Sequence, residues 1–340
     1  MASDLDEDLF YDIEDNDESI NFNVPSFASK YLTSDKLDKF FNFEDHSALN
    51  LLHINCRSLK KNFGPDNNLL NSLSGYLSAI AVTETWLTDA LHDVYHIPGY
   101  KFIGQSRVNK SGGGIGIFIK NCFDYKLRPD LCQMSQCIEC LFIEIHRAGK
   151  QLIIIGCIYR PPNTDTSVFM SEMLLILNKI DQISNKIAII AGDFNLNLLK
   201  HSSHQPTGEF INLLLSYNFL PTICQPTRIT DFSATLIDNI FVSCSKLDYN
   251  SAIVYSDISD HLPIALHLLA RLPKIKLLSN ATRRSFDAKS IENFSHCLAN
   301  SNWNIVYDAL CISSDPSHAY DCFFNLYKSI FDACFPEYSI

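Results

Sequence analysis

Five hydrophobic runs of this chain each reach a polar residue at or near their end, and this arrangement constrains the fold more than any other feature. The polar residues are Asn55, Glu84, Asp193 with Asn195, Asp238, and Asp260 with His261. A continuous apolar run bounded by turn residues is typical of a buried strand, so a residue at its end is held rigidly and still reaches solvent. We therefore expect several polar side chains at the edge of a buried sheet.

The pattern of apolar residues predicts many strands and few helices. Strands are expected at 49–55, 78–84, 100–103, 114–119, 141–145, 151–159, 186–191, 236–242 and 262–268. Helices are expected at 67–77, 167–183 and 208–217, the last one capped by Thr207. The glycines at 112–114 predict a turn with positive φ. This order favours an α/β fold in which two sheets pack together with helices outside.

Acidic residues are concentrated at the start of the chain. The net charge is -11, and residues 1–20 carry nine acidic and no basic side chains, which leaves about -2 for the remainder. An acidic block with few large apolar residues usually stays disordered and repels polyanions. We expect a disordered acidic arm at 1–46 and a folded domain at 47–270. Any binding of nucleic acid is expected from the folded domain only.

The composition and the apolar pattern of the sequence change after Leu269. Basic residues form a connector there, and helices are expected at 291–307 and 318–335. Five side chains at helical spacing in the second helix are expected to be buried: Phe323, Leu326, Tyr327, Ile330 and Phe331. We expect 271–340 to form a separate helical appendage whose apolar stripe packs against a partner.

Cysteine content and hydropathy indicate the expected cellular compartment of the protein. The chain has 12 cysteines, but its N-terminus has neither the basic nor the apolar segment of a secretion signal. Reduced cysteines in an intracellular protein are therefore expected. Cys137 and Cys140 form a C-x-x-C pair without a second pair or a histidine at zinc-ligand spacing, so a metal site there is disfavoured. No apolar run reaches the length of a membrane span, so no membrane partner is expected.

Carboxylates and amides at two of the strand ends suit phosphate and metal chemistry. Glu84 is a hard oxygen ligand of the kind that binds Mg²⁺, although a lone strand-end glutamate is more often a surface ion-pair partner. Asp193 and Asn195 are two residues apart, so their side chains can point the same way from an extended backbone. Together they could orient water and donate to a phosphate oxygen, or form an Asx-turn after the strand.

Histidine supplies a group that titrates near neutral pH. His261 could act as a general base or stabilise charge, and a carboxylate on its ring would fix its tautomer. The neighbouring Asp260 faces the other way on a strand, so the better candidate is Asp238, which needs a partner in its apolar run. A capped turn histidine is the alternative. Tyr159 and Arg160 are phosphate donors after their strand, or ordinary strand-end residues.

Taken in order, these blocks resemble the endonuclease/exonuclease/phosphatase superfamily, the metal-dependent phosphodiesterases of the deoxyribonuclease I fold. They are most similar to the apurinic-type endonuclease domain of non-LTR (LINE-type) retrotransposons. The similarity covers about 48–269 and is carried by the blocks at 54–59, 83–87, 112–116, 159–162, 192–195, 237–241 and 259–263. Arg57 stands where several cellular relatives have an acid, which favours the retroelement branch and puts abasic-site specificity in doubt.

The resemblance implies a fold and a set of roles. It implies a four-layer α/β sandwich of the deoxyribonuclease I type. Glu84 would hold Mg²⁺, with Mn²⁺ as a substitute, and Asn55 and Asp260 would lie close to the metal. Asp193 and Asn195 would orient the attacking water and the phosphate, Tyr159 would contact a phosphate oxygen, and Asp238 would support His261.

The expected activity is metal-dependent nicking of DNA that leaves a 3′-hydroxyl, as in target-primed retrotransposition, in the nucleus when the target is chromosomal. Candidate phosphate contacts are Arg57, Lys60, Lys61, Arg107, Lys110 and Arg160, each of which is more often a solvated charge. The segment at 271–340 looks like the connector before a reverse transcriptase, a module absent from this chain. A phosphatase or sphingomyelinase-type relative, or a non-enzymatic remnant, are the alternatives.

Overall fold

The chain forms two compact units, Met1–Lys274 and Ile275–Ile340, which are described separately. The computed structural model describes residues 29–41, 48–62, 75–88, 91, 95, 97–107, 112–146, 151–243, 248–269, 282–312 and 316–339. Most of the expected acidic arm, most of the expected helix at 67–77, and Lys110 lie outside these residues.

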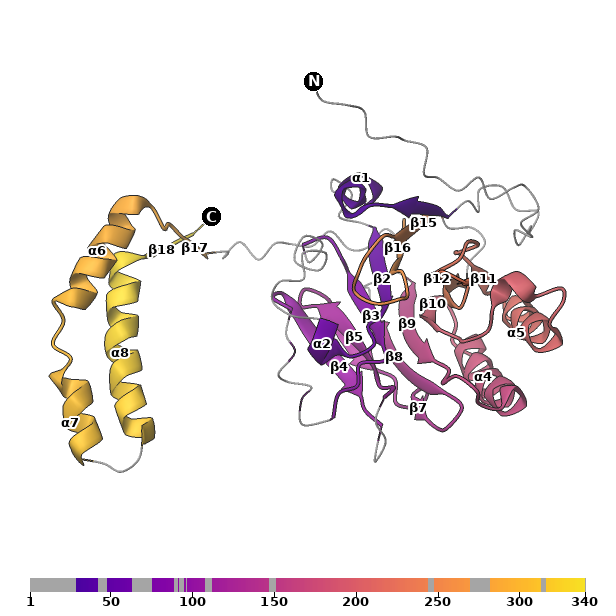
Figure 1. Ribbon diagram of the computed structural model, residues 1–340, viewed down its shortest axis with the longest axis horizontal. Helices are drawn as coiled ribbons and strands as arrows, with labels where there is room; N and C mark the ends of the chain where they lie inside the picture. Colours follow the sequence, from indigo (N-terminus) through magenta and orange to yellow (C-terminus); the bar gives the residue numbers. More distant parts are fainter. Residues whose placement is uncertain are drawn as a thin grey trace, which may run out of the picture. The chain divides into compact units, whose positions relative to one another are not determined.

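The first unit contains two mixed sheets (Figure 1). The first sheet has the order β1 (Lys30–Leu32), β15 (Tyr249–Val254), β16 (Ile264–Leu268), β2 (Leu49–Asn55), β3 (Ala79–Thr83), β5 (Ile115–Lys120) and β4 (Tyr100–Gln105). The second has the order β11 (Leu220–Pro221), β14 (Asp238–Val242), β10 (Lys186–Asp193), β9 (Leu152–Tyr159), β8 (Glu139–Ile145) and β6 (Tyr125–Leu127), and β7 (Gln133–Met134) pairs with β8. β2 is parallel to β3, and β9 is parallel to β10.

The central strands of the first sheet, β16, β2, β3 and β5, are buried on both faces. In β2, Leu49 and Leu51 join the large core cluster that also contains the second sheet, while Leu52 and Ile54 join a second cluster. Contacts of β2, β3 and β5 with β8, β9 and β10 show that the two sheets pack face to face. Because alternate residues of a strand point to opposite faces, a run that is apolar throughout can fill both clusters.

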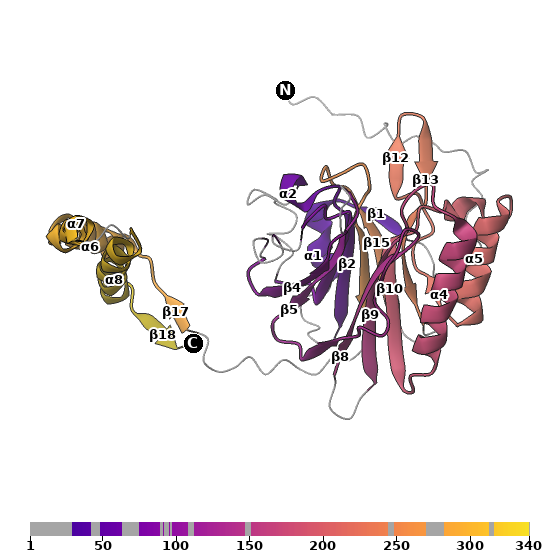
Figure 2. The ribbon, with the colours of Figure 1, turned by 90° about the horizontal axis from the view of Figure 1, so that it is seen from below.

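Helices cover the outside of both sheets. α4 (Thr166–Asp181) and α5 (Gln205–Ser216) lie on the second sheet (Figure 2). The buried stripe of α4 consists of Phe169, Met173, Ile176, Leu177 and Ile180. The second core cluster, on the first sheet, also holds Leu37 of the short helix α1 (Leu37–Phe40), its C-cap residue Phe41, and Leu59 of the short helix α2 (Leu59–Asn62). The unit is thus a four-layer α/β sandwich of the deoxyribonuclease I type, as predicted.

The prediction that Thr207 caps the second of these helices is wrong. α5 begins at Gln205, and its N-cap is His204. Pro206 lies in the first turn, where its fixed φ suits the helix and its missing N–H is not needed. Thr207 is buried within that turn, and its hydroxyl lies 2.9 Å from His204 Nδ1.

The expectation of a disordered arm over 1–46 is wrong for residues 29–41. β1 pairs in parallel with β15, and it is followed by a single turn of 3-10 helix (Ser34–Lys36) and by α1. Leu37 and Phe41 are fully buried in the second core cluster. The acidic residues that suggested disorder end at Glu18, and the apolar residues farther along complete the sheet and its cover.

The second unit is helical. It contains α6 (Ala288–Ala299), α7 (Asn304–Ile312) and α8 (Pro316–Cys334), with a short antiparallel pair of β17 (Thr282–Arg284) and β18 (Glu337–Ser339). The single helix expected at 291–307 is therefore two helices, because α6 ends at an Asn300 C-cap and the chain turns before α7. The stripe of α8 is less buried than predicted, since Phe323 is 40% exposed and its other four members are partly exposed.

The helices that the structure describes include none with the length and apolar character needed to cross a bilayer.

Candidate active site at the shared edge of the two sheets

The register of the strands brings the predicted polar residues to one edge. Asn55 at the end of β2 pairs with Thr83, the residue before Glu84. In the second sheet, Asp193 at the end of β10 pairs with Tyr159 on one side and with Asp238 on the other. Since the two sheets pack face to face, residues from both can meet in one cluster.

His261 is held by Asp238, as the sequence predicted. Its Nδ1 donates to Asp238 Oδ2 over 2.9 Å, and both side chains are buried. The Thr227 hydroxyl donates to the same carboxylate oxygen over 2.8 Å. Ser259 completes the support: its hydroxyl donates to the carbonyl of Asn55 over 2.6 Å and accepts from the backbone N–H of His261 over 3.1 Å. This arrangement fixes the ring and leaves Nε2 for a substrate.

Asp193 is oriented by two asparagines. The Asn55 amide donates to Asp193 Oδ2 over 2.8 Å. The backbone N–H of Asn195 donates to Oδ1 over 3.0 Å, and its side-chain amide donates to Oδ2 over 3.3 Å. Asn195 has a φ of 47°, a left-handed conformation that asparagine tolerates better than most residues. The carboxylate is fully buried, so its direction is set by these donors.

The protonation states of the cluster are linked. Burial and the neighbouring Asp238 carboxylate raise the pKa of Asp193 to about 8, against the opposing effect of His261. Burial would lower the pKa of His261, but the carboxylates of Asp238, Asp193 and Asp260 outweigh it and raise the pKa to about 9. Burial would likewise raise the pKa of Asp238, but His261 holds it below its ordinary value. At neutral pH His261 is therefore a cation paired with the Asp238 carboxylate, and Asp193 is mostly protonated.

Glu84 lies beside this cluster. The amide nitrogen of Asn55 that bonds Asp193 also donates to Glu84 Oε1 over 3.0 Å, and Trp86 Nε1 donates to Oε2 over 3.2 Å. Glu84 has a φ of 53°, which is unfavourable for a residue with a side chain. Backbone bonds hold this conformation: Ser58 N–H donates to the Glu84 carbonyl, and Thr85 and Trp86 N–H donate to Gly114 and Gly113.

The donor set at this edge suits a divalent cation. Glu84, Asn55 and Asp193 supply hard oxygen atoms. Asp193, Asp238 and His261 also have ligand atoms within 4.8 Å of one another, but a protonated His261 cannot itself bind a metal. Asp260, the third residue expected close to the metal, forms ion pairs with two arginines. Arg57 Nη1 lies 2.7 Å from Asp260 Oδ1, and Arg228 Nη2 lies 2.7 Å from Oδ2.

Tyr159 adjoins a buried ion pair. Its ring lies 5.8 Å from the guanidinium carbon of Arg107, and Arg107 Nε donates to Glu139, which is fully buried. The other oxygen of Glu139 accepts from Gly114 N–H over 2.7 Å. Burial, with Glu84 and Asp193 nearby, raises the pKa of the Tyr159 phenol. Tyr159 therefore remains a protonated donor at neutral pH.

The predicted phosphate contacts differ in their surroundings. Lys60 and Lys61 are exposed on α2, and Arg57 is exposed while it pairs with Asp260. Arg107 is tied to Glu139. The suggestion that Arg160 contacts phosphate is not supported, because its side chain is buried and donates to Thr164 O over 2.6 Å and to Asn195 O over 3.2 Å. Arg160 instead stabilises, through these hydrogen bonds, the loop that carries Asn195.

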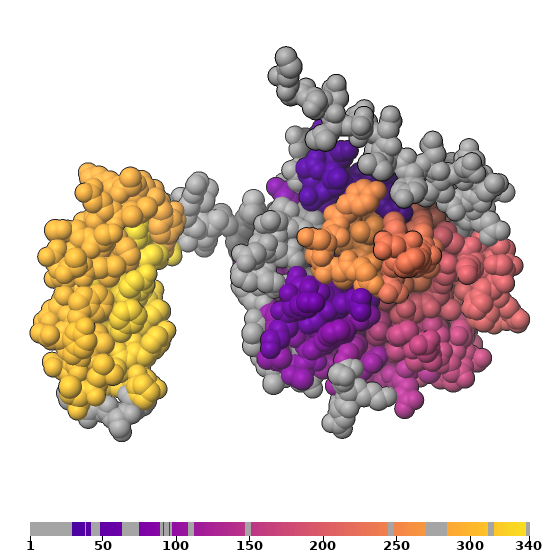
Figure 3. Space-filling model, viewed as in Figure 1, coloured from indigo at the N-terminus to yellow at the C-terminus, as the bar shows by residue number. Residues whose placement is uncertain are grey.

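Sequence reasoning missed the residues that organise the rim of the site. They are Thr227 and Arg228. Thr227 precedes and Arg228 begins a small hairpin of β12 (Arg228–Thr230) and β13 (Ser233–Thr235) that projects from the unit (Figure 2). On the face seen in Figure 3, the orange surface from this later part of the first unit meets the violet surface of its early strands. Arg57 and Asp260, 203 residues apart, bridge these two parts of the sequence. Nothing local in the sequence links residues so far apart.

Comparisons with known proteins agree with this architecture. The sequence profile of the endonuclease/exonuclease/phosphatase family matches residues 50–261. The endonuclease domain of TRAS1, a telomere-specific non-LTR retrotransposon, is similar in structure, with a TM-score of 0.51 and 13% identity over 66% of this chain and 99% of that one.

Two further solved structures are also similar. The APE2 catalytic domain from Xenopus laevis has a TM-score of 0.51 and 17% identity over 66% of this chain and 93% of that one. The AP endonuclease LMAP from Leishmania major has a TM-score of 0.52 and 14% identity over 69% of this chain and 91% of that one. At such identities the likeness concerns the fold. No curated protein sequence matches this chain.

Proposed function

The chain belongs to the endonuclease/exonuclease/phosphatase family, and on that premise we propose that it is a divalent-metal-dependent endonuclease that nicks DNA and leaves a 3′-hydroxyl. The observation that carries this proposal is the buried set of Asp193, Asp238 and His261, joined through Asn55 to Glu84. A carboxylate oriented by amides, next to a cationic imidazole, suits attack on a phosphodiester.

Each residue of the set has a chemical task in this reaction. Asp193, oriented by Asn55 and Asn195, accepts the proton of the attacking water. In its deprotonated form, a carboxyl whose pKa is raised to about 8 is a far better proton acceptor than an ordinary aspartate, so the rate of this step should rise with pH up to about 8. The new bond joins the water oxygen to phosphorus, and the bond to the 3′-oxygen breaks in line with it; the departing oxygen takes a proton from solvent water and becomes the 3′-hydroxyl.

The donors stabilise the charge that develops on the phosphate. His261, cationic at neutral pH because its pKa is raised to about 9, donates from Nε2 to a non-bridging oxygen. Asp238 acts through His261 and is a positioning residue. Tyr159 donates a hydrogen bond from its phenol to a second non-bridging oxygen. Glu84, with Asn55, would hold Mg²⁺ or Mn²⁺, which neutralises phosphate charge when bound.

The DNA partner is proposed from charge and exposure. Arg57, Lys60 and Lys61 are exposed cations on the segment that follows β2, next to Asn55. Contacts to backbone phosphates carry little sequence information, so specificity from them is weak. We extend the proposal to nuclear action on chromosomal DNA, with a reverse transcriptase as partner.

Plasmid nicking tests the proposal. Purified full-length chain with Mg²⁺ is expected to convert supercoiled plasmid to the open circle, while Asp193→Ala, of comparable melting temperature, does so at least about a hundred-fold more slowly. Equal behaviour of the two proteins would reject the assignment. Phosphate release from inositol phosphates, or cleavage of sphingomyelin, without nicking would assign another substrate to the same site.

A further inference from the structure

Asp260 and its two arginines form an ion-pair cluster, here called the arginine bridge, to which the reaction above gives no task. Arg57 Nη1 lies 2.7 Å from Asp260 Oδ1, and Arg228 Nη2 lies 2.7 Å from Oδ2. Arg228 Nε also donates to Oδ2, over 2.9 Å. Both oxygens of the carboxylate therefore accept hydrogen bonds from guanidinium groups. Two adjacent cations repel a divalent ion that approaches the same oxygens.

Arg57 is held beside the candidate site by its backbone. Its N–H donates to Asn55 Oδ1 over 3.2 Å, and its φ of 38° is a left-handed conformation that few residues with a side chain adopt. The hydrogen bond and the charge of Asp260 raise the pKa of Arg57 against the effect of burial, and the charge of Glu84 adds to them. The guanidinium therefore lies within electrostatic reach of the carboxylate proposed to hold the metal. It is also accessible, because the Arg57 side chain is 48% exposed.

Arg228 is fixed by a different part of the chain. It forms an antiparallel β-bridge with His261, and the N–H of Leu262 donates to the carbonyl of Thr227 over 2.7 Å. Asp260 thus lies between an arginine of the β12–β13 hairpin and one of the segment after β2. Two cations and one anion leave the arginine bridge with a net charge of +1.

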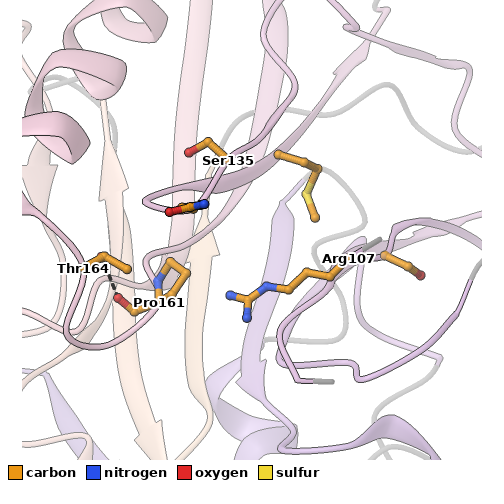
Figure 4. Close-up of a pocket in the computed structure, with 7 residues that line it drawn as sticks. Arg107, Ser135, Pro161 and Thr164 are labelled. Atoms are coloured by element: carbon orange, nitrogen blue, oxygen red, sulfur yellow. Dashed lines mark hydrogen bonds between the residues drawn. The ribbon is translucent and has the colours of Figure 1, made fainter. Parts of the chain in front are cut away.

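Two other cations near the site are each neutralised by one carboxylate. The Arg107 guanidinium extends into the hollow shown in Figure 4, but the buried Glu139 carboxylate pairs with it. His261 is paired with Asp238 in the same way. The arginine bridge thus offers an anionic phosphate a positive charge that these two pairs do not.

We propose that Asp260 is not a ligand of the divalent ion in this protein, and that it instead holds Arg57 against the scissile phosphate. The proposal rests on the endonuclease function proposed above. Arg57 is then a catalytic residue whose guanidinium donates to a non-bridging phosphate oxygen, and Asp260 and Arg228 are positioning residues. A guanidinium stays charged in proteins, and its planar fork directs its donors. Binding of the metal then depends on Glu84 and Asn55.

Metal binding tests the assignment of Asp260 without DNA and without turnover. Mn²⁺ is titrated into the full chain, and the free ion is measured by electron paramagnetic resonance. The double variant Arg57→Gln with Asp260→Asn removes one positive and one negative charge, so it keeps the local net charge. We expect it to bind Mn²⁺ within about three-fold of the wild type, while Glu84→Gln, of comparable melting temperature, binds at least about ten-fold more weakly. A loss in the double variant as large as that of Glu84→Gln would overturn the proposal.

Nicking kinetics test the contact of Arg57 with phosphate. Under single-turnover conditions with Mg²⁺ and saturating DNA, Arg57→Gln is expected to cleave about a hundred-fold more slowly, while its DNA affinity changes only a few-fold. Arg57→Lys keeps the charge but lacks the fork, so it should recover part of the rate. Lys126→Gln, at an exposed lysine of the edge strand β6, is the matched control and should keep the wild-type rate. A full rate in Arg57→Gln, or a loss confined to DNA affinity, would overturn the contact.

Asp260→Asn separates positioning from support of the fold. With Arg57 released, the rate at saturating DNA should fall at least about ten-fold. DNA affinity should be kept or should increase, because the variant removes a negative charge, and the melting temperature should stay close to that of the wild type. An unchanged rate in Asp260→Asn would contradict the positioning role.

The two kinds of measurement keep this proposal distinct from the proposed function. A wild type that nicks DNA, with a double variant that loses Mn²⁺ as Glu84→Gln does, rejects the assignment of Asp260 and leaves the endonuclease function in place. A wild type that binds Mn²⁺ but nicks no DNA rejects the endonuclease function and the role of Arg57 with it.

Discussion

At the residue scale, the candidate site concentrates buried charge in an unusual way. Asp193 and Asp238 occupy directly paired positions on neighbouring strands, and both are buried. Two carboxylates so placed repel each other, and the proton on His261 relieves that repulsion. Protonation of His261 therefore serves the fold and the proposed chemistry together.

We expect the free energy of unfolding to fall as the pH rises from about 6 to about 9. The pKa of His261 is raised to about 9 from its ordinary 6.5, so its stabilising contribution is complete below pH 6.5 and is lost on the way to pH 9. Asp193, with its pKa raised to about 8, acts in the same direction at lower pH. A difference of one pH unit between the folded and unfolded pKa corresponds to about 1.4 kcal/mol of stability. Urea unfolding at several pH values measures the slope, and a flat profile would contradict it.

Asp238→Asn should reduce nicking strongly without unfolding the chain. The amide keeps the shape but removes the charge that raises the pKa of His261, so we expect a rate loss on the order of a hundred-fold or more. NMR titration of His261 should show its pKa falling. Thr227→Val is the matched control, since it removes one hydrogen bond to the same carboxylate and leaves the charge in place. An unchanged His261 pKa in Asp238→Asn would refute the positioning role.

At the scale of elements, the site depends on the glycine turn that supports the segment after β3. Gly112, Gly113 and Gly114 all have positive φ, as the sequence predicted. A Cβ on Gly114 would lie 2.5 Å from the Thr85 hydroxyl, and one on Gly113 would collide with Arg107. The turn therefore couples Glu84 to the Arg107–Glu139 pair by close contact.

Gly114→Ala tests this coupling against a matched glycine. Gly99 has nearly the same φ, +85° against +83°, but a Cβ there meets nothing within 4 Å. Gly99→Ala should cost only the backbone strain of roughly 1–2 kcal/mol. Gly114→Ala should cost more and should also slow nicking, because Thr85 and Glu84 must shift. Chemical unfolding and plasmid nicking give both quantities, and equal effects of the two variants would show that the close contact is unimportant.

Long apolar runs made most strands of the two sheets predictable from sequence. Strands that are short, or that mix polar with apolar residues, were not predicted. The runs at 49–55 and 186–191 appear as β2 and β10 because their burial on both faces demands continuous hydrophobicity. β15, with its Tyr-Asn-Ser start, and the three-residue strands β12 and β13 lack that signal. In the site, Asp238 could be paired with His261 because a buried charge needs a partner. The ion pairs of Asp260 with Arg57 and Arg228 could not be predicted from sequence, because only the tertiary fold brings these residues together.

At the scale of the whole molecule, the two units differ in how well they bury their apolar residues. The first has two extensive core clusters of its own. The second keeps Tyr307, Tyr320, Phe323 and Phe324 at least 40% exposed, and Phe323, Tyr327 and Phe331 stack along α8. An aromatic surface of this kind favours association.

A chain ending at Lys274 is expected to stay folded and to keep the plasmid-nicking rate within a few-fold of the full chain. The expectation follows from the separate core and from a family match that ends at residue 261. The shortened chain should also self-associate less, which light scattering at several concentrations measures. Loss of nicking with an unchanged melting temperature would show that the second unit contributes to activity.

The facing carboxylates of β10 and β14 have a consequence for protein engineering. Removing one of them, as in Asp193→Asn, takes away a fully buried titratable group and keeps the shape of the side chain. Such a change should be neutral or favourable for folding while it abolishes the proposed chemistry. Selection of variants for heat resistance or high expression alone would therefore enrich inactive proteins, and any stabilisation campaign on this scaffold needs an activity screen in parallel.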